Sequence, residues 1–253
     1  MPGRLKRHRL FYLRKPKART RRTTIRIMKA GKMNFEAARI KMVDNQIRTT
    51  DVTSHAVLAA FLSVPREEFV PAALKPLAYI DSDIELTADA TGGRRYLMEP
   101  SPLAKLLQLA AISKDDKVLE IGCGTGYASA ILSELAASVV ALESDATLAS
   151  EALATLGRLG HANVSIVTGD LEKGHAVGAP YDVIFVHGAV ETIPDSVLSQ
   201  LNDGGRLVAV VGLGNASRAQ LFLRENGRTS ERLAFNTSVK PLPGFRLARE
   251  FVF

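Results

Sequence analysis

The sequence predicts an α/β fold in which a mostly parallel, seven-stranded sheet ends in an antiparallel hairpin and carries a helical N-terminal cap. From Lys117 onward, short apolar segments alternate with amphipathic ones, an order typical of parallel sheets covered by helices. Later in the chain, Asn226-Gly227 separates two apolar segments, and Asn-Gly is the strongest short-range signal of a hairpin. The 253 residues suffice for one large α/β domain or two small ones.

The positive charge of the chain is concentrated at its start. Residues 1–32 hold 13 of the 33 Lys and Arg residues and no Asp or Glu, so the rest holds 20 basic and 26 acidic residues. A block of like charge has few apolar side chains to bury, so we expect residues 1–32 to be a disordered extension. Three interpretations are open: a segment that contacts nucleic acid or acidic lipid, an organelle transit peptide, or an upstream extension before a start at Met33.

Several classes of protein are excluded by what the chain lacks. No apolar run approaches the roughly 18–20 residues that a membrane-spanning helix needs. The single cysteine, Cys123, rules out an internal disulfide and a site built from several cysteines, and the five histidines show no metal-ligand spacing. We therefore expect a cytoplasmic protein with no metal and no membrane contact, in which Cys123 fills space.

The first helices of the cap are predicted from apolar spacing. One helix is expected over 34–49, with Asn34 as its N-cap. Its apolar stripe would be Phe35, Ile40, Val43 and Ile47. A second helix is expected from near Asp51 to Pro65. Its apolar face would be Val52, Leu58, Phe61 and Leu62.

The next segment is polar and then turns helical. Residues 80–95 are expected to form a loop. Ser101 is expected to cap a helix that begins at Pro102. Its buried face would be Leu103, Leu106, Leu107 and Ala110.

The sheet and its helices follow in alternation. Strands are predicted at 117–121, 138–142, 164–168, 181–186 and 206–211. Helices are predicted at 127–136, 146–159 and 192–202.

The chain is organised around a glycine-rich turn after the first of these strands. Gly122, Gly124 and Gly126 follow the apolar strand, and Tyr127 takes the place where a dinucleotide-binding turn has its third glycine. The pattern points away from NAD or FAD and towards S-adenosylmethionine, although such corners also occur without a ligand. Gly122, Gly124, Gly126 and Tyr127 are therefore candidates for cofactor binding. Ligands of open α/β sheets bind at the carboxyl ends of the strands, so neighbouring strand ends should complete the site.

Three acidic residues at strand ends are candidates for cofactor binding. Glu143 could accept hydrogen bonds from both ribose hydroxyls, and its alternative is a surface carboxylate. Asp170 could take the adenine amino group beside a backbone N–H near Leu171, or be a turn aspartate. Glu120 could bind the methionine amino group through water or set the loop.

His187 ends the fourth strand, on the rim where a substrate should lie. A histidine there could act as a general base, but a single histidine beside glycine is more often structural. Both interpretations are open.

The chain resembles the protein-L-isoaspartate O-methyltransferases, class I methyltransferases with a Rossmann-like fold. The resemblance covers nearly all of 34–245 and rests on several runs of residues. They are Met42-Val43-Asp44-Asn45-Gln46-Ile47, Val64-Pro65-Arg66 with Phe69-Val70-Pro71, Leu77-Ala78-Tyr79 with Asp81, Glu120 to Tyr127, Gly169-Asp170, Ala179-Pro180-Tyr181-Asp182 and Gly204-Gly205-Arg206-Leu207-Val208. The resemblance implies a cap and substrate-side segment at 33–100 and an S-adenosylmethionine-binding domain at 101–253.

The chain departs from this family where the acceptor should bind. The family's Thr-Ile-Ser-Gln-Pro reads Tyr96-Leu97-Met98-Glu99-Pro100 here, so Met98 replaces the serine at the methyl-transfer site. The preceding glycine-rich approach contains Arg94 and Arg95, which could face a substrate carboxylate or be a solvated pair.

The resemblance implies methyl transfer to the free carboxylate of isoaspartyl residues in damaged proteins. Two alternatives stay open because of Met98: the same chemistry on another carboxylate or small molecule, and an inactive cofactor-binding sensor or partner protein. The implied partner is a protein or peptide carrying isoaspartate. Nucleic acid would be contacted only nonspecifically, by the basic residues of 1–32, and the sequence leaves the oligomeric state open.

Overall fold

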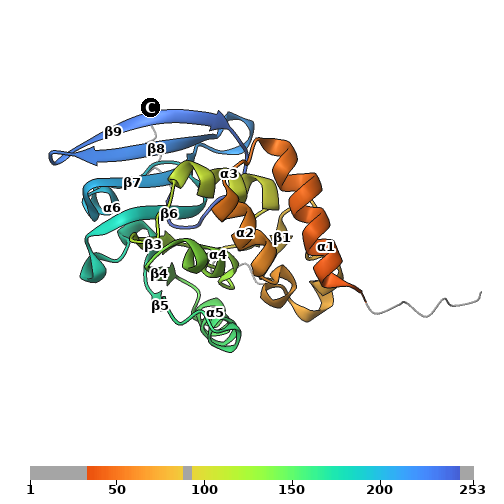
Figure 1. Ribbon diagram of the computed structural model, residues 1–253. Coiled ribbons are helices and arrows are strands. Elements are labelled where there is room, and N and C mark those ends of the chain that lie inside the picture. Colours follow the sequence, from red (N-terminus) through yellow and green to blue (C-terminus); the bar gives the residue numbers. More distant parts are fainter. Residues whose placement is uncertain (1–32, 88–92, 246–253) are drawn as a thin grey trace, which may run out of the picture. The chain divides into compact units, whose positions relative to one another are not determined.

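A computed structural model describes residues 33–87 and 93–245, so the predicted extension at 1–32 lies outside the described residues. The main sheet has the strand order β5-β4-β3-β6-β7-β8-β9 (Figure 1). Its strands are β3 (Lys117–Ile121), β4 (Ser138–Glu143), β5 (Val164–Thr168), β6 (Tyr181–Val190), β7 (Leu201–Val211), β8 (Arg218–Glu225) and β9 (Arg228–Asn236). The pairs from β5 to β7 are parallel, whereas β8 and β9 pair antiparallel. The predicted sheet is confirmed.

The hairpin between β8 and β9 forms at the expected dipeptide. Asn226 and Gly227 have φ values of 52° and 74°. Both residues thus adopt the left-handed conformation that a two-residue hairpin turn requires, and which asparagine and glycine tolerate best.

The predicted first helix exists but changes its winding. It comprises the α-helix α1 (Phe35–Met42), the π-helical turn η1 (Val43–Ile47) and the 3₁₀ turn η2 (Arg48–Thr50). Asn34 is the N-cap, since its Oδ1 accepts a hydrogen bond from the N–H of Ala37 at 3.0 Å. The expected apolar stripe is wrong at Ile40, which is 46% exposed, because the change to a wider turn shifts which side chains face the core.

The other cap helices begin at different residues from those predicted. Helix α2 (His55–Ser63) starts after Ser54, not near Asp51, and Leu62 lies on its outer face. Helix α3 (Pro100–Ala110) has proline as its first residue, so Ser101 is not its cap. The four predicted core residues of α3 are all buried: Leu103, Leu106, Leu107 and Ala110.

The segment predicted to be a loop contains a small second sheet. Strand β1 (Ile84–Glu85) pairs antiparallel with β2 (Tyr96–Leu97). This two-stranded sheet was missed because two-residue strands are too short for a periodic pattern. Arg95 precedes its second strand, and Met98 follows it.

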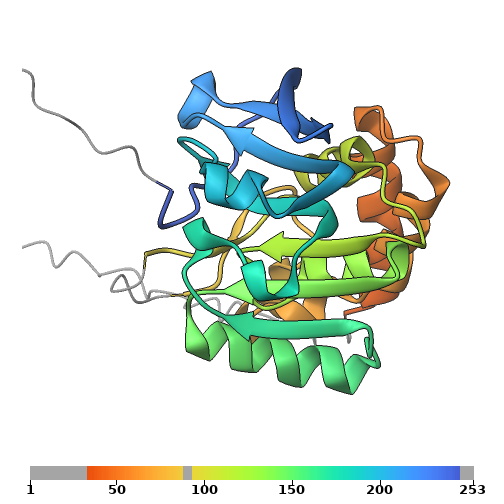
Figure 2. The same cartoon turned by 90° about the vertical axis from the view of Figure 1, so that its left-hand side faces the viewer.

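The two faces of the main sheet are covered unequally. One face packs against α3, α4 (Tyr127–Leu135) and α5 (Ala146–Leu159). Helices α1 and α2 pack on this layer and belong to the same core, and Figure 1 shows α1 to α3 gathered on that side. The other face is covered by short elements, including α6 (Asp195–Leu198) and the segment that ends at Phe245 (Figure 2). The predicted helix 192–202 is therefore mostly wrong. Leu201 already belongs to β7, where it pairs with Tyr181.

Short 3₁₀ turns complete the described chain. They are η3 (Arg66–Phe69), η4 (Ala72–Leu77), η5 (Leu171–Lys173), η6 (Ala176–Gly178) and η7 (Gly214–Ala216). The described residues from Asn34 onward form one compact unit. None of their helices is long and apolar enough to cross a membrane.

Candidate functional site

The glycine-rich turn joins β3 to α4 through three residues with left-handed backbones. Gly122, Gly124 and Gly126 have φ values of 89°, 58° and 91°. Such angles strain any residue with a Cβ, so this turn depends on glycine at all three positions. The N–H of Gly122 donates to the carbonyl of Leu142, which ties the turn to the end of β4.

Glu143 ends β4 directly beside this turn and is fully buried. One carboxylate oxygen, Oε2, accepts from the N–H of Gly124 at 2.7 Å and from Nη2 of Arg95 at 2.6 Å. The other, Oε1, accepts from the N–H groups of Ser144 at 2.8 Å and Asp145 at 3.1 Å. The predicted ribose ligand thus lies at the glycine turn, and a buried arginine is its partner.

The space that the glycines leave open is filled by side chains of this chain. A Cβ added to Gly122 would lie 2.6 Å from Cδ1 of Leu242 and 3.1 Å from Nη2 of Arg95. A Cβ added to Gly124 would lie 3.0 Å from Cδ1 of Leu86. In this conformation Arg95, Leu242 and Leu86 together close the turn.

The third strand end differs from the second in exposure. Asp170 follows β5, its side chain is 57% exposed, and it forms an ion pair of 2.6 Å with Lys173. Leu171 is buried. Asp170 is therefore accessible to a polar group, while Leu171 offers an apolar surface and its backbone.

Tyr127 was predicted to contribute to cofactor binding, but its side chain packs into the cap. The ring is fully buried and meets Phe61 and Phe69 edge-on, with centroids 6.2 and 5.6 Å away. The guanidinium of Arg66 lies 4.8 Å from the ring centroid. Burial raises the pKa of the Tyr127 hydroxyl to about 12. Only the backbone of Tyr127 remains near the turn.

Glu120 and His187 come together from β3 and β6. Nδ1 of His187 lies 3.1 Å from Oε1 of Glu120, and the second oxygen, Oε2, accepts from Oγ of Ser129 at 2.5 Å. Both side chains are almost wholly buried. Glu120 therefore orients the imidazole and holds α4 in place. This favours the interpretation in which Glu120 fixes the conformation of the glycine-rich turn.

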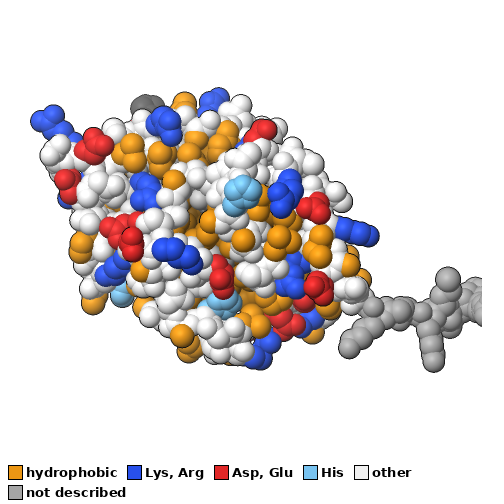
Figure 3. All heavy atoms as spheres, viewed as in Figure 1, with side chains coloured by type: hydrophobic (Ala, Val, Ile, Leu, Met, Phe, Trp, Pro, Cys, Tyr) orange, Lys and Arg blue, Asp and Glu red, His pale blue; other side chains and the backbone are white. Residues whose placement is uncertain are grey.

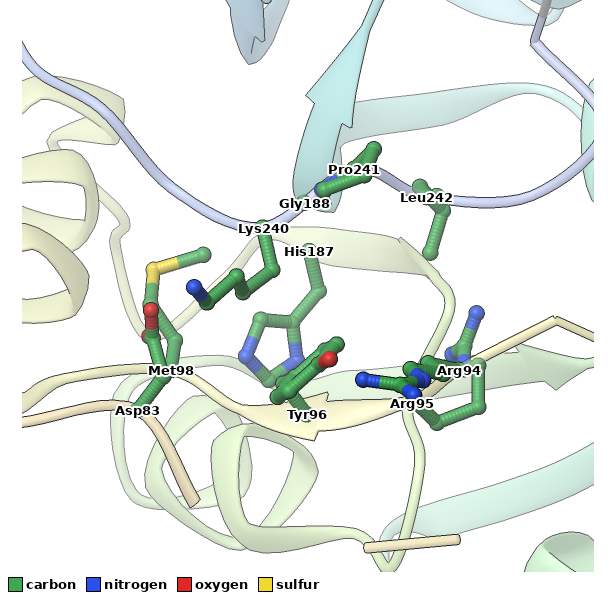
Figure 4. Close-up of a pocket in the computed structure, with 10 residues that line it drawn as sticks. All are labelled: Asp83, Arg94, Arg95, Tyr96, Met98, His187, Gly188, Lys240, Pro241 and Leu242. Atoms are coloured by element: carbon green, nitrogen blue, oxygen red, sulfur yellow. The ribbon is translucent and has the colours of Figure 1, made fainter. Parts of the chain in front are cut away.

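A small pocket, with a cavity volume of about 20 Å³, opens beside His187. Figure 4 shows the imidazole between Lys240 and Met98 on one side and Arg95 on the other. Of the four residues predicted on the substrate side, all line this pocket: Arg94, Arg95, Met98 and His187. The structure brings them together but gives the two arginines different surroundings. Arg95 is buried on Glu143, whereas the side chain of Arg94 is 66% exposed and lies 3.6 Å from Glu85.

Sequence reasoning missed Lys240, which also lines the pocket, and named Tyr96 only as part of the altered family motif. The ammonium of Lys240 lies 5.5 Å from the centroid of the Tyr96 ring. Lys240 reaches the site because its carbonyl accepts from the N–H of Ala189 at 2.9 Å, which holds the segment after β9 against β6. No local pattern signals such a contact between segments so far apart in the sequence.

Two further predictions concern Cys123 and metals. Cys123 is buried, and burial, followed by the nearby carboxylates of Glu120 and Glu143, raises the pKa of its thiol well above the usual range. This fits a space-filling residue. Within residues 33–87 and 93–245, no group of three or more His, Cys, Asp or Glu side chains could hold a metal ion.

Comparisons with known proteins bear on this arrangement. The family model described as protein-L-isoaspartate(D-aspartate) O-methyltransferase matches residues 37–242. A protein-L-isoaspartate O-methyltransferase of Koribacter versatilis is 38% identical over 210 residues, which are 83% of this chain and 92% of the relative. One of Herpetosiphon aurantiacus is 36% identical over 212 residues, with the same coverage of each chain.

Solved structures give the same result for the fold. A protein-L-isoaspartate O-methyltransferase superposes with a TM-score of 0.71 at 29% identity, covering 82% of this chain and 67% of that one. A Plasmodium falciparum protein described as a beta-aspartate methyltransferase, in complex with S-adenosyl-L-homocysteine, gives 0.70 at 16% identity. It covers 84% of this chain and all of its own.

Proposed function

Because the chain belongs to the protein-L-isoaspartate(D-aspartate) O-methyltransferase family, we propose that it methylates the free carboxylate of L-isoaspartyl residues in damaged proteins, with S-adenosylmethionine as methyl donor. The observation that carries the proposal is the corner formed by the glycine turn and the buried Glu143. This corner has the parts that a ribose-bearing cofactor requires: a close backbone approach and a fixed carboxylate.

The cofactor residues that we propose match the predicted set. Glu143 would accept from the ribose hydroxyls and Asp170 from the adenine amino group, with the backbone of Leu171 beside it. The turn residues Gly122, Gly124 and Gly126 and the backbone of Tyr127 would face the amino-acid portion, with Glu120 behind the turn. These residues have the chemical groups that the cofactor needs. In the conformation described here, Arg95, Leu242 and Leu86 occupy the space beside the glycines, so they must move for the cofactor to bind.

The chemistry asks little of the protein as an acid or base. The bound cofactor would supply an electrophilic methyl group. A carboxylate acceptor is already ionised near pH 7, so its oxygen needs no general base. The chain's contribution is to hold the carboxylate in line with the methyl group and to exclude water, which can account for a large share of rate enhancement.

A second candidate function follows from Met98. Its side chain is 3% exposed and lines the pocket, where a thioether cannot donate a hydrogen bond. This favours an acceptor held differently from that of the serine-containing relatives, such as another carboxylate or small molecule. A third hypothesis is that the chain does not transfer methyl groups at all. It is favoured by the buried ion pair in which Arg95 occupies Glu143, the proposed ribose ligand.

The deciding experiment compares an isoaspartyl peptide with its aspartyl twin, using radiolabelled S-adenosylmethionine and the full chain. We expect label on the isoaspartyl peptide alone. Cofactor binding without transfer to either peptide would contradict the repair function and leave the other two, and Met98→Ser would then be tested for gained activity. Absence of cofactor binding would overturn all three.

The partner and the cellular location of the chain are also proposals. A protein or peptide bearing isoaspartate is the implied partner. The single buried cysteine is compatible with the reducing cytoplasm. Fractionation of cells would test the cytoplasmic location, and sedimentation of the purified chain would give its oligomeric state.

A further inference from the structure

Two side chains that close the glycine turn also form a wall of the small pocket beside His187. A Cβ added to Gly122 would lie 2.6 Å from Cδ1 of Leu242 and 3.1 Å from Nη2 of Arg95. Both side chains line the pocket as well, and Figure 4 shows them on the side of it that lies opposite Met98. These two side chains, which we call the plug, therefore border both the cofactor corner and the pocket on the substrate side.

Neither ligand fits while the plug is in place. A ligand that lies against the backbone of Gly122 needs the volume that Cδ1 of Leu242 occupies. The pocket has a cavity volume of about 20 Å³, which is roughly the space that one water molecule needs. A carboxylate on its carbon chain is larger than a water molecule, so the pocket cannot accept it unless its walls move.

Leu242 belongs to a strap, residues 239–245, that runs beside the end of β6. The N–H of Ala189 donates to the carbonyl of Lys240 at 2.9 Å, and the N–H of Leu242 donates to the carbonyl of Ala189 at 2.8 Å. A hollow of about 720 Å³ borders the same strap at Pro241 and Leu242. The side chain of Leu242 thus has room outside the turn, and it can leave the turn while the backbone of the strap stays bonded to β6.

Arg95 is held in the plug by a single side-chain hydrogen bond among the described residues. Its Nη2 donates to Oε2 of Glu143 at 2.6 Å, whereas its Nη1 is buried and has no partner there. A buried donor without a partner is unfavourable, and the great majority of such groups in proteins are paired. Ribose hydroxyls that bind Glu143 would compete for the one bond that keeps Arg95 in place.

We infer that the cofactor opens the acceptor pocket: binding of S-adenosylmethionine displaces Arg95 and Leu242 from the glycine turn, and their departure makes room for the acceptor. The inference rests on the proposed function for the identity of the two ligands. The unliganded chain is then mostly closed, and both ligands bind the open conformation. Each ligand therefore raises the affinity for the other by the same factor. An acceptor that arrives before the methyl donor meets a closed pocket.

The test measures binding without turnover and uses the full chain, S-adenosylhomocysteine and an isoaspartyl peptide. Calorimetry gives the affinity for the peptide with and without saturating S-adenosylhomocysteine, and the affinity for S-adenosylhomocysteine without peptide. Leu242→Ala removes the atoms that lie over Gly122, and Arg95→Ala removes the guanidinium. The matched control is Leu213→Ala, because Leu213 also borders the hollow but is 44% exposed.

We expect S-adenosylhomocysteine to strengthen peptide binding by the wild-type chain about tenfold or more, a coupling of the usual size between two sites. Each plug variant should bind S-adenosylhomocysteine several-fold more tightly than the wild type. The coupling in that variant should fall by the same factor, because both quantities depend on the population of the closed conformation. Leu213→Ala should match the wild type in both measurements.

Equal peptide affinity with and without S-adenosylhomocysteine would overturn the inference, as would plug variants that gain no affinity for S-adenosylhomocysteine. If Leu242→Ala fails to fold, Arg95→Ala decides alone. A wild-type chain that binds S-adenosylhomocysteine but neither binds nor methylates the isoaspartyl peptide refutes the proposed function. In that case the affinities of the plug variants for S-adenosylhomocysteine still decide whether the plug exists.

Discussion

Glu143 shows how much of the site depends on single atoms. An ionised carboxylate offers about four lone-pair sites, and Gly124, Ser144, Asp145 and Arg95 provide four close donors. Three of these donors are backbone N–H groups that belong to the corner itself. Among the described residues, the only side-chain donors to Glu143 are the adjacent hydroxyl of Ser144 and the guanidinium of Arg95. Because Arg95 comes from a distant segment, it is the donor that ribose hydroxyls would replace.

Replacing Arg95 should therefore separate stability from cofactor affinity. We expect Arg95→Ala to lower the free energy of unfolding of the unliganded chain by about 3–5 kcal/mol, because a buried carboxylate loses its countercharge. The same variant should bind S-adenosylhomocysteine several-fold more tightly, since no internal ion competes for Glu143. Urea unfolding and calorimetric titration measure the two effects.

Arg94→Ala is the matched control for this experiment, because Arg94 is adjacent in sequence and exposed. It should change neither quantity appreciably. Weaker cofactor binding by Arg95→Ala would contradict the expectation and identify Arg95 as a ligand of the cofactor.

Cys123 gives a second prediction at this scale. Burial and the carboxylates of Glu120 and Glu143 raise the pKa of its thiol, so little thiolate forms and little of it is accessible. We expect a disulfide reagent at pH 8 to label the folded chain slower than the urea-unfolded chain by about two orders of magnitude. Equal labelling rates would show that the glycine turn opens freely.

Only part of the residue-scale site could be predicted. The position of Glu143 at a strand end was predicted from local spacing, and the structure puts it at the glycine turn, while its role in cofactor binding stays a prediction. The pairing of Glu120 with His187 joins residues 67 positions apart, and that of Arg95 with Glu143 joins residues 48 apart. Such pairs depend on sheet order and side-chain packing, which periodicity does not encode.

At the scale of elements, Arg66 connects three segments of the cap. It lies in η3 and is fully buried, with Nε donating to the carbonyl of Ala78 at 2.7 Å and Nη2 to that of Met98 at 2.8 Å. Its guanidinium also covers the Tyr127 ring at the start of α4. Burial lowers the pKa of this guanidinium. The run Val64-Pro65-Arg66 thus holds the Met98 segment in place.

We expect Arg66→Met to lower the free energy of unfolding by about 1–3 kcal/mol. Methionine fills much of the volume and removes a buried charge, but it leaves two buried carbonyls without donors. Urea unfolding measures the change, and Arg48→Met is the control because its ion pair with Asp44 is exposed. A loss no larger than that of the control would show that water replaces the guanidinium.

Elements were predictable where packing repeats a simple pattern. The strands 117–121 and 164–168 and the helix 146–159 agree with β3, β5 and α5, because their apolar residues recur with a clear period. The two-residue strands β1 and β2 and the four-residue helix α6 carry no such period. These short elements form because the chain around them is already fixed.

At the scale of the whole molecule, charge divides the chain into two parts. The face shown in Figure 3 carries positive and negative side chains intermixed. In the sequence, residues 33–253 hold 20 basic and 26 acidic residues, against 13 basic and no acidic residues in 1–32. Nonspecific attraction to a polyanion should therefore come from the first 32 residues, since affinity for nucleic acid grows with the number of neutralised phosphates.

A chain shortened to begin at Met33 tests this division. All buried core residues of the described chain lie between Met42 and Phe245, so we expect the shortened chain to keep its unfolding midpoint and its affinity for S-adenosylhomocysteine. We expect the full chain to bind single-stranded DNA in a salt-dependent way at low salt, and the shortened chain to lose this binding, because its net charge changes from +7 to −6. Thermal unfolding, calorimetry and fluorescence anisotropy at two salt concentrations measure these quantities. Unchanged DNA binding would place the contact on the α/β part, whereas a lower midpoint would show that residues 1–32 stabilise the fold.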